Sequence, residues 1–190
     1  MKVQEAKLEA DSVDNHLVSL RRSTIGENEE PDCGYIGIRI DRNGTWYYRG
    51  SPIDRKAMVK LFATVLNRHE DGSYWLTTPV ENGWIEVDEV PYVVVEVMCN
   101  GSGRKKEIDF RTNLDVIVPL DREHPLRMER QPESCESKPY IHVEKGLDAR
   151  IARAVFYHLV DLGEKRVGDE GTMFGIWSRG EFYSLGAFEE

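Results

Sequence analysis

The sequence predicts an α+β protein of two related halves, each a small, mostly antiparallel sheet with one main helix. An Asn-Gly turn at residues 43–44 separates two strand-like runs, which is the strongest short-range signal for a β-hairpin. Amphipathic segments at 53–66 and 147–162 each follow a strand-like run. Each is followed by a strand-like run that carries a tryptophan, Trp75 or Trp177. This repeated order indicates an internal duplication.

Composition and charge indicate which classes of partner the protein can bind. The chain has 190 residues, a net charge of −9, 40% hydrophobic and 31% charged residues, which is typical of a water-soluble globular protein. The negative charge argues against nucleic acid or an anionic membrane, because both need excess Lys and Arg. Cys33, Cys99 and Cys135 form no Cys-x-x-Cys pair, so we expect free thiols and no metal or cofactor. No apolar run is long enough for a signal or a membrane span, which predicts a cytoplasmic protein.

The chain divides into four predicted segments. The first is an acidic N-terminal extension with four Lys or Arg against eight Asp or Glu, in which Val13, Leu17 and Leu20 have helical spacing. The connecting loop is rich in proline, serine and charge. The predicted bounds are 1–34 for the extension, 35–118 for the first half, 119–138 for the loop and 139–190 for the second half.

The first half begins with the predicted hairpin, in which Ile36, Ile38 and Ile40 alternate before the turn. Its helix is expected to begin at Ser51, which can cap it, with Pro52 at the first helical position. Predicted strands follow at 74–78, 84–87, 92–98 and 108–118. The third of these is apolar on both faces, which predicts a central strand.

The second half has a predicted strand at 140–143, the helix at 147–162, and strands at 174–178 and 182–185. Aligning Asp54 with Asp148 also matches Phe62 with Phe156. We therefore expect the two helices to be the repeated elements, with both phenylalanines in the core.

Several motifs together resemble one bacterial family. They are Cys33-Gly34, Ile38-Arg39-Ile40, Gly44-Thr45-Trp46-Tyr47-Tyr48, Gly50-Ser51-Pro52-Ile53, Thr78-Pro79-Val80-Glu81, Phe110-Arg111-Thr112-Asn113, His124-Pro125-Leu126-Arg127 and Gly175-Ile176-Trp177-Ser178 with Gly180. In this order they resemble the domain-of-unknown-function family 1285 over residues 33–186. The chain departs from the family pattern at Tyr35, Gly37 and Val116, where acidic residues are expected.

The resemblance implies a duplicated α+β core whose C-terminal half is similar to pleckstrin-homology-like domains. It also implies that the characteristic residues gather between the halves, where a small, nucleotide-based ligand would bind in a signalling role. The resemblance implies no established reaction.

The best candidate chemistry lies in residues 108–118. If this is one strand, Arg111, Asn113 and Asp115 share a face, about 6.6 Å apart at each two-residue step. A guanidinium, an amide and a carboxylate in a row suit a polar ligand with an anionic group. The alternative is that Arg111 forms an ordinary surface ion pair with Asp109 or Asp115.

His124 and Arg127 follow shortly after that strand. Trp46 and Trp177 could stack on a ring, although aromatic residues in small sheets are more often core. The predicted ligand-binding residues are Arg111, Thr112, Asn113, Asp115, His124, Arg127, Trp46, Arg49 and Trp177.

The sequence contains no Gly-x-Ser-x-Gly, His-Glu-x-x-His, phosphate-loop or calcium-loop motif. We therefore expect a non-enzymatic protein that binds a small anionic metabolite or nucleotide between its halves. One alternative is an enzyme that uses Arg111, Asp115 and His124. Another is a protein-interaction scaffold that uses the second-half sheet.

Overall fold

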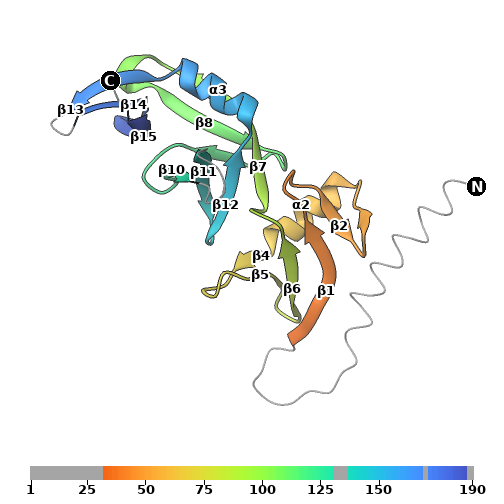
Figure 1. Ribbon diagram of the computed structural model, residues 1–190. Coiled ribbons are helices and arrows are strands. Elements are labelled where there is room, and N and C mark those ends of the chain that lie inside the picture. The colour runs from red at the N-terminus through yellow and green to blue at the C-terminus, as the bar shows by residue number, and fades with distance from the viewer. Residues whose placement is uncertain (1–31, 131–136, 169–170, 188–190) are drawn as a thin grey trace, which may run out of the picture.

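The computed structural model describes residues 32–130, 137–168 and 171–187, which form three β-sheets and two α-helices (Figure 1). The prediction of an α+β protein is confirmed. The predicted helix of the N-terminal extension lies outside these residues. Among the residues that are described, no helix is long and apolar enough to cross a membrane.

The first sheet has six strands and is accompanied by helix α2. In chain order the elements are β1 (Asp32–Ile40), β2 (Trp46–Tyr48), β3 (Ser51–Pro52), α2 (Lys56–Thr64), β4 (Leu66–Arg68), β5 (Tyr74–Thr77) and β6 (Asn82–Val87). Their order across the sheet is β3-β2-β1-β6-β5-β4. All neighbours are antiparallel except the central pair, β1 and β6, which is parallel. The predicted hairpin is confirmed, because Asn43 and Gly44 lie in the turn between β1 and β2.

The second sheet also has six strands. They are β7 (Tyr92–Asn100), β8 (Glu107–Thr112), β9 (Ile117–Pro119), β10 (Leu126–Arg130), β11 (Ser137–Glu144) and β12 (Leu147–Ile151), with a short 3₁₀ turn, η2 (Gly103–Lys105), between β7 and β8. Their order is β10-β11-β12-β7-β8-β9, and the central pair, β7 and β12, is again parallel.

The two sheets repeat the same strand order. Read from one edge, the third, second, first, sixth, fifth and fourth strands of each set follow one another, with a parallel pair in the middle. The helices are not equivalent. Helix α2 connects the third and fourth strands of its sheet, whereas α3 (Arg153–Asp161) follows the sixth strand of the second sheet. The duplication is therefore carried by the strands.

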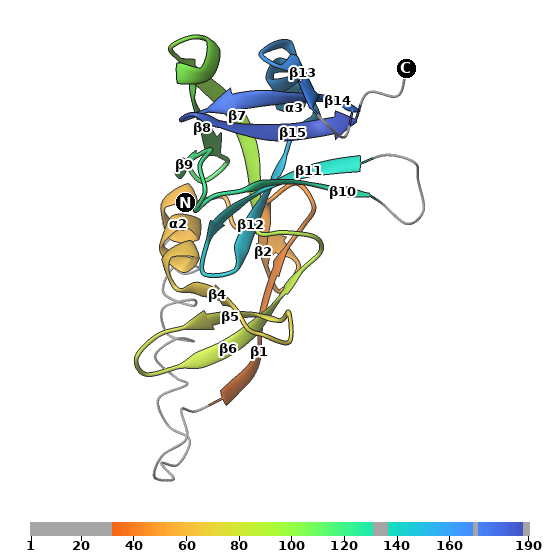
Figure 2. The same cartoon turned by 90° about the vertical axis from the view of Figure 1, so that its left-hand side faces the viewer.

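A third sheet follows α3 and contains β13 (Glu164–Gly168), β14 (Gly171–Ser178) and β15 (Glu181–Ala187) in sequential antiparallel order. It lies at the end of the molecule opposite β1, β5 and β6 (Figures 1 and 2). The buried apolar side chains form one cluster that includes residues of all three sheets, so the halves share a continuous core.

The predicted boundary at residue 118 is wrong. The strands β7, β8 and β9 precede that boundary, yet they pair with one another and with β12 in the second sheet. The halves divide between β6 and β7, and the predicted loop 119–138 contains β10. Sequence order alone did not reveal this division, because the parallel β7–β12 pair joins strands that are far apart in the chain.

Both helices begin later than predicted. Ser51 and Pro52 form an edge strand, where proline is tolerated because no neighbour needs its missing N–H. The segment Leu147–Ile151 is a central strand with Leu147 and Ala149 fully buried, so pairing on both sides overrides the helix propensity of these residues.

The alignment of the two helices is shifted. The buried positions are Val59 and Ala63 in α2 and Val155 and Leu159 in α3, so they correspond two residues later than the sequence alignment places them. Phe62 and Phe156 are both partly buried and pack against the core. Both rings therefore lie at the core, in helices that occupy different places in the topology.

Candidate functional site

The predicted strand 108–118 is a hairpin. β8 ends at Thr112, the chain turns at residues 113–116, and β9 returns antiparallel to it, with Arg111 opposite Ile117. Asp115 has a positive φ of 62°, which a continuous strand does not allow. The predicted row of Arg111, Asn113 and Asp115 on one strand face is therefore wrong.

Asn113 joins the two halves through its side chain. Its Oδ1 accepts a hydrogen bond from the backbone N–H of Val93 (3.1 Å), and its Nδ2 donates to the carbonyl of Gly44 (3.0 Å) in the β1–β2 turn. Thr112 is fully buried, and its hydroxyl accepts from the N–H of Val116 (3.1 Å). Both residues use their polar groups to hold the hairpin and the junction.

Arg111 and Asp115 belong to an exposed ionic cluster. Arg111 pairs with Glu96 (Nε–Oε2, 2.6 Å) and with Asp115 (Nη1–Oδ1, 3.2 Å). Asp115 also meets Lys56 and Lys60 of α2 at 2.8 and 2.7 Å. Hydrogen bonds from these two ammonium groups hold the pKa of Asp115 well below its usual range. Arg111 is already paired with two carboxylates. It therefore forms a surface ion pair, which was the alternative to a ligand contact.

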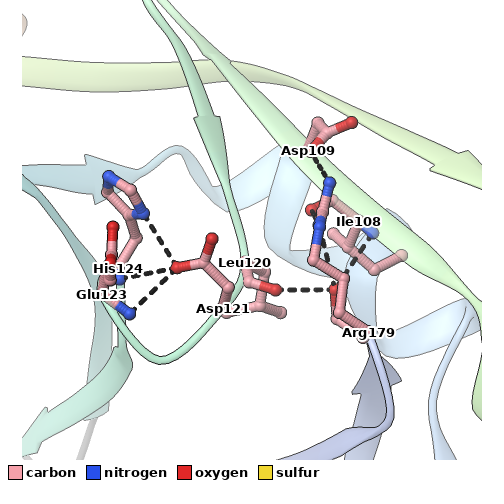
Figure 3. Close-up of polar contacts among 8 residues, drawn as sticks. Ile108, Asp109, Leu120, Asp121, Glu123, His124 and Arg179 are labelled. Atoms are coloured by element: carbon pink, nitrogen blue, oxygen red, sulfur yellow. Dashed lines mark hydrogen bonds and ion pairs between the residues drawn. The ribbon is translucent and has the colours of Figure 1, made fainter.

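His124 stabilises a loop. Its Nδ1 lies 2.9 Å from Oδ1 of Asp121, and the same oxygen accepts from the N–H groups of Glu123 and His124 (Figure 3). The outcome is an Asx-type turn that leads from β9 into β10.

The turn between β14 and β15 is attached to β8 nearby. Arg179 donates to the carbonyl of Ile108 (2.8 Å) and to Oδ1 of Asp109 (2.6 Å) (Figure 3). The fully buried Ser178 donates to the carbonyl of Leu120 (2.7 Å). The family-like Trp-Ser-Arg-Gly stretch therefore has a structural role in joining the third sheet to the second.

Three of the four remaining predicted residues are not brought together as one site. Trp46 is 1% exposed and stacks on Phe62 within the core (centroids 6.3 Å apart), so the core interpretation applies. Arg49 lies in the β2–β3 turn with a positive φ of 48° and covers the ring of Tyr48. Trp177 is 8% exposed and lies in β14 of the third sheet.

Arg127 does lie at the junction of the halves. Its Nη1 is 3.0 Å from Oδ2 of Asp148, a carboxylate whose side chain is only 7% exposed. Arg68 of the first half approaches the same oxygen (4.0 Å), and Nδ1 of His142 lies 3.4 Å from the other one. Both arginine side chains remain about half exposed, at 46% for Arg127 and 40% for Arg68. We call these four residues the Asp148 cluster.

An open cavity of about 440 Å³ adjoins this cluster. It is lined by Arg68, His69, Glu70 and Gly72 around the β4–β5 turn, and by Gly146 in the β11–β12 turn. Gly146 has a positive φ of 74°, and a Cβ there would touch the side chain of Arg68. A turn from each half thus forms one wall of the cavity. Sequence reasoning missed this site because Asp148 was expected at the start of a helix.

The linker between the halves, residues 88–91 between β6 and β7, is bound to β11 of the second sheet through Glu89. Glu89 accepts from the Tyr140 hydroxyl (2.6 Å) and from Nζ of Lys138 (3.0 Å). Burial alone would raise the pKa of Glu89, but these hydrogen bonds outweigh it and hold that pKa below its usual range. Arg127 stacks on the Tyr140 ring (5.0 Å), which connects the linker to the Asp148 cluster.

No metal site is formed by the described part of the chain, in which no three His, Cys, Asp or Glu side chains are grouped to hold an ion.

Comparisons with known proteins identify relatives of unknown function. Residues 26–90 match the family described as "Domain of unknown function (DUF1285), N-terminal domain", and residues 91–185 match "Protein of unknown function (DUF1285), C-terminal domain". The two matches meet where the first sheet gives way to the second. No protein with a curated description matches the chain.

Two solved structures have the same fold. A DUF1285 family protein from Silicibacter pomeroyi DSS-3 is 40% identical, with a TM-score of 0.77 over 90% of this chain and 94% of its own. A DUF1285 family protein from Shewanella baltica OS155 is 24% identical, with a TM-score of 0.53 over 66% of this chain and 91% of its own.

Proposed function

The chain belongs to the DUF1285 family, and we propose that it binds a small anionic ligand, such as a nucleotide or a phosphorylated metabolite, at the junction of its two halves. The observation that carries the proposal is the meeting of Arg68 and Arg127, one from each half, on the buried carboxylate of Asp148 beside an open cavity.

The arrangement suits an anion because Asp148 positions the arginines without using all their donors. A guanidinium has five N–H groups, and a single carboxylate engages at most two or three of them from each partner. About half of each arginine side chain remains exposed to a ligand. Arg127 also lies 3.6 Å from the exposed carboxylate of Glu129, a surface ion pair that an anionic ligand can displace.

Ligand binding at this site could also act as a signal, because the site is formed by both halves. Arg68 belongs to the first sheet and Arg127 to the second, so an anion held by both would strengthen the contact between the halves. A binding protein of this kind would transmit occupancy as a change in the junction. We propose further that the protein is cytoplasmic and that its second half is similar to pleckstrin-homology-like domains.

The test is a thermal-shift screen of nucleotides and phosphorylated metabolites against the purified chain. At a hundredfold excess over Kd, a ligand that binds the folded state adds about 2.7 kcal/mol of stability. Arg127→Ala and Arg68→Ala should each reduce the binding free energy of the ligand found in the screen by on the order of 2–3 kcal/mol, because each removes a charge-assisted contact.

Arg55→Ala is the matched control, since Arg55 is an exposed arginine of the first half at the N-terminus of α2. It should leave the affinity unchanged. Equal weakening by all three variants would show a general charge effect and contradict a site at the junction. Chemical conversion of the ligand would favour the alternative of an enzyme.

A further inference from the structure

A second cationic region lies on the third sheet, at the other end of the molecule from β1 (Figure 1). It contains exposed basic side chains from two segments that are far apart in sequence: Arg104 and Lys105 of η2, and Lys165 and Arg166 of β13. We call these four residues the basic patch. Its charge contrasts with the net charge of −9 of the whole chain.

Aromatic rings hold the two arginines of the patch. The guanidinium carbon of Arg104 lies 4.9 Å from the centre of the Trp177 ring, and that of Arg166 lies 5.5 Å from the same centre. Arg166 also lies over Phe182, at 5.4 Å. Trp177 itself is fixed by a hydrogen bond from its Nε1 to Glu164 (2.6 Å). The arginines are therefore supported from beneath by a rigid pair of rings.

Stacking leaves the hydrogen-bonding edge of a guanidinium available. The N–H groups lie in the plane of the group, whereas the ring occupies its face, so a stacked arginine can still bind a carboxylate with two parallel bonds. Within the part of the chain that the structure describes, the ion pairs do not include Arg104 or Arg166.

The patch borders a strand edge. Among the described residues β13 pairs with β14 alone, so its outer edge presents backbone N–H and C=O groups that no other strand occupies. Val167 on this strand is 82% exposed. The opposite edge strand, β15, lies against β10 instead. The free edge and Arg166 thus occur on the same short strand, and Arg104 of η2 lies over the same Trp177 ring as Arg166.

We propose that this end of the molecule binds a short acidic segment of a partner protein, which adds to the edge of β13 as an extended strand and places its carboxylates on Arg104 and Arg166. Backbone pairing at β13 would supply affinity, and the arginines would select acidic side chains. The patch is small and the rest of the protein is acidic, which disfavours a long polyanion such as nucleic acid or an anionic membrane. This proposal is independent of the ligand site at the junction.

The experiment measures fluorescence anisotropy of a labelled peptide of about eight residues that alternates Glu and Thr, a length typical of one strand. The full chain should bind it, and a peptide with Gln in place of Glu should bind at least roughly tenfold more weakly. Arg104→Glu and Arg166→Glu should each weaken the acidic peptide at least roughly tenfold. Arg55→Glu makes the same charge change in the first half, at the N-terminus of α2, and should leave binding unchanged.

Hydrogen exchange gives a second readout that does not depend on charge. The bound peptide should slow amide exchange at β13, because its backbone would occupy the free edge. No peptide binding, equal binding of the Gln peptide, or equal loss in Arg55→Glu would overturn the proposal. Tighter binding of single-stranded DNA or of phosphatidylserine vesicles at the same patch would also overturn it, in favour of a polyanion or a membrane.

Discussion

Two carboxylates of the second half, Asp115 and Asp148, each meet cations of the first half, but their surroundings differ. Asp115 lies in the β8–β9 turn, is 37% exposed, and pairs with Lys56 and Lys60 of α2. Asp148 lies on the central strand β12, is 7% exposed, and contacts Arg127 and Arg68. The cations of both clusters are similarly exposed, but solvent reaches the carboxylate of Asp115 and is largely excluded from that of Asp148. Similar pairs of charges can therefore differ greatly in what they contribute.

The difference also separates a surface contact from a binding site. The partners of Asp115 are lysines on one helix, with compact charges that water surrounds. The partners of Asp148 are arginines that approach from opposite halves beside a cavity. Burial of the carboxylate is what positions the arginines, and this is why the proposed ligand site lies there.

Loss of Asp148 should have the largest effect on stability. Asp148→Ala removes the buried carboxylate that Arg127 and Arg68 share and leaves two half-exposed cations close together, which should cost on the order of 3 kcal/mol in the free energy of unfolding. Urea denaturation measures this loss. Asp148→Asn, which keeps the volume and some hydrogen bonding, should lose less. A change in Asp148→Ala no greater than that in Asp115→Ala would remove the distinction between the two carboxylates.

Loss of Asn113 should have the second largest effect on stability, because its side chain pairs with buried backbone groups on both sides of the junction. Asn113→Ala leaves the N–H of Val93 and the carbonyl of Gly44 without this partner, which should cost about 1–3 kcal/mol. The control is Asn67→Ala, which removes a single local bond to Val65 and should cost less. Equal losses measured by thermal or urea unfolding would show that Asn113 does not hold the halves together.

The linker carboxylate should make stability depend on pH. The folded pKa of Glu89 lies below its unfolded value of about 4.3, so its contribution is present above that pH and is lost as pH falls through the folded pKa. The stability difference between the wild type and Glu89→Gln should therefore be greatest near neutral pH and shrink below about pH 4. Denaturation curves across this range measure it, and a constant difference would argue against the ionised linker contact.

Asp115→Ala should have the smallest effect. Its charges are exposed and screened, so the melting temperature should stay close to that of the wild type, and any difference should decrease as salt is added. Differential scanning calorimetry at low and high salt checks this. A loss that persists at high salt would mean that the cluster holds α2 against the second half in a way that exposure does not suggest.

Local patterns in the sequence predicted most of the strands and the presence of two helices. The Asn-Gly turn, the alternation of Ile36, Ile38 and Ile40, and the apolar residues of β7 are short-range signals, and the structure contains the elements they predict. Arg127 was also among the predicted site residues and lies at the junction. The strands and helices depend on neighbours in the chain, so a single sequence was sufficient for them, whereas Arg127 was named from a family motif.

The tertiary structure alone decided which elements repeat and where the charges meet. Leu147–Ile151 has the composition of a helix but is a strand, because β11 and β7 pair with it on both sides. Arg111 and Asp115 were predicted on one strand face, but Asp115 lies in a turn with a positive φ and forms its ion pair with Arg111 from there. Arg68 and Asp148 are distant in the chain, and only the packing of one sheet against the other brings them together. Each of these outcomes depends on non-local pairing, whose free energy exceeds the local preferences that sequence patterns report.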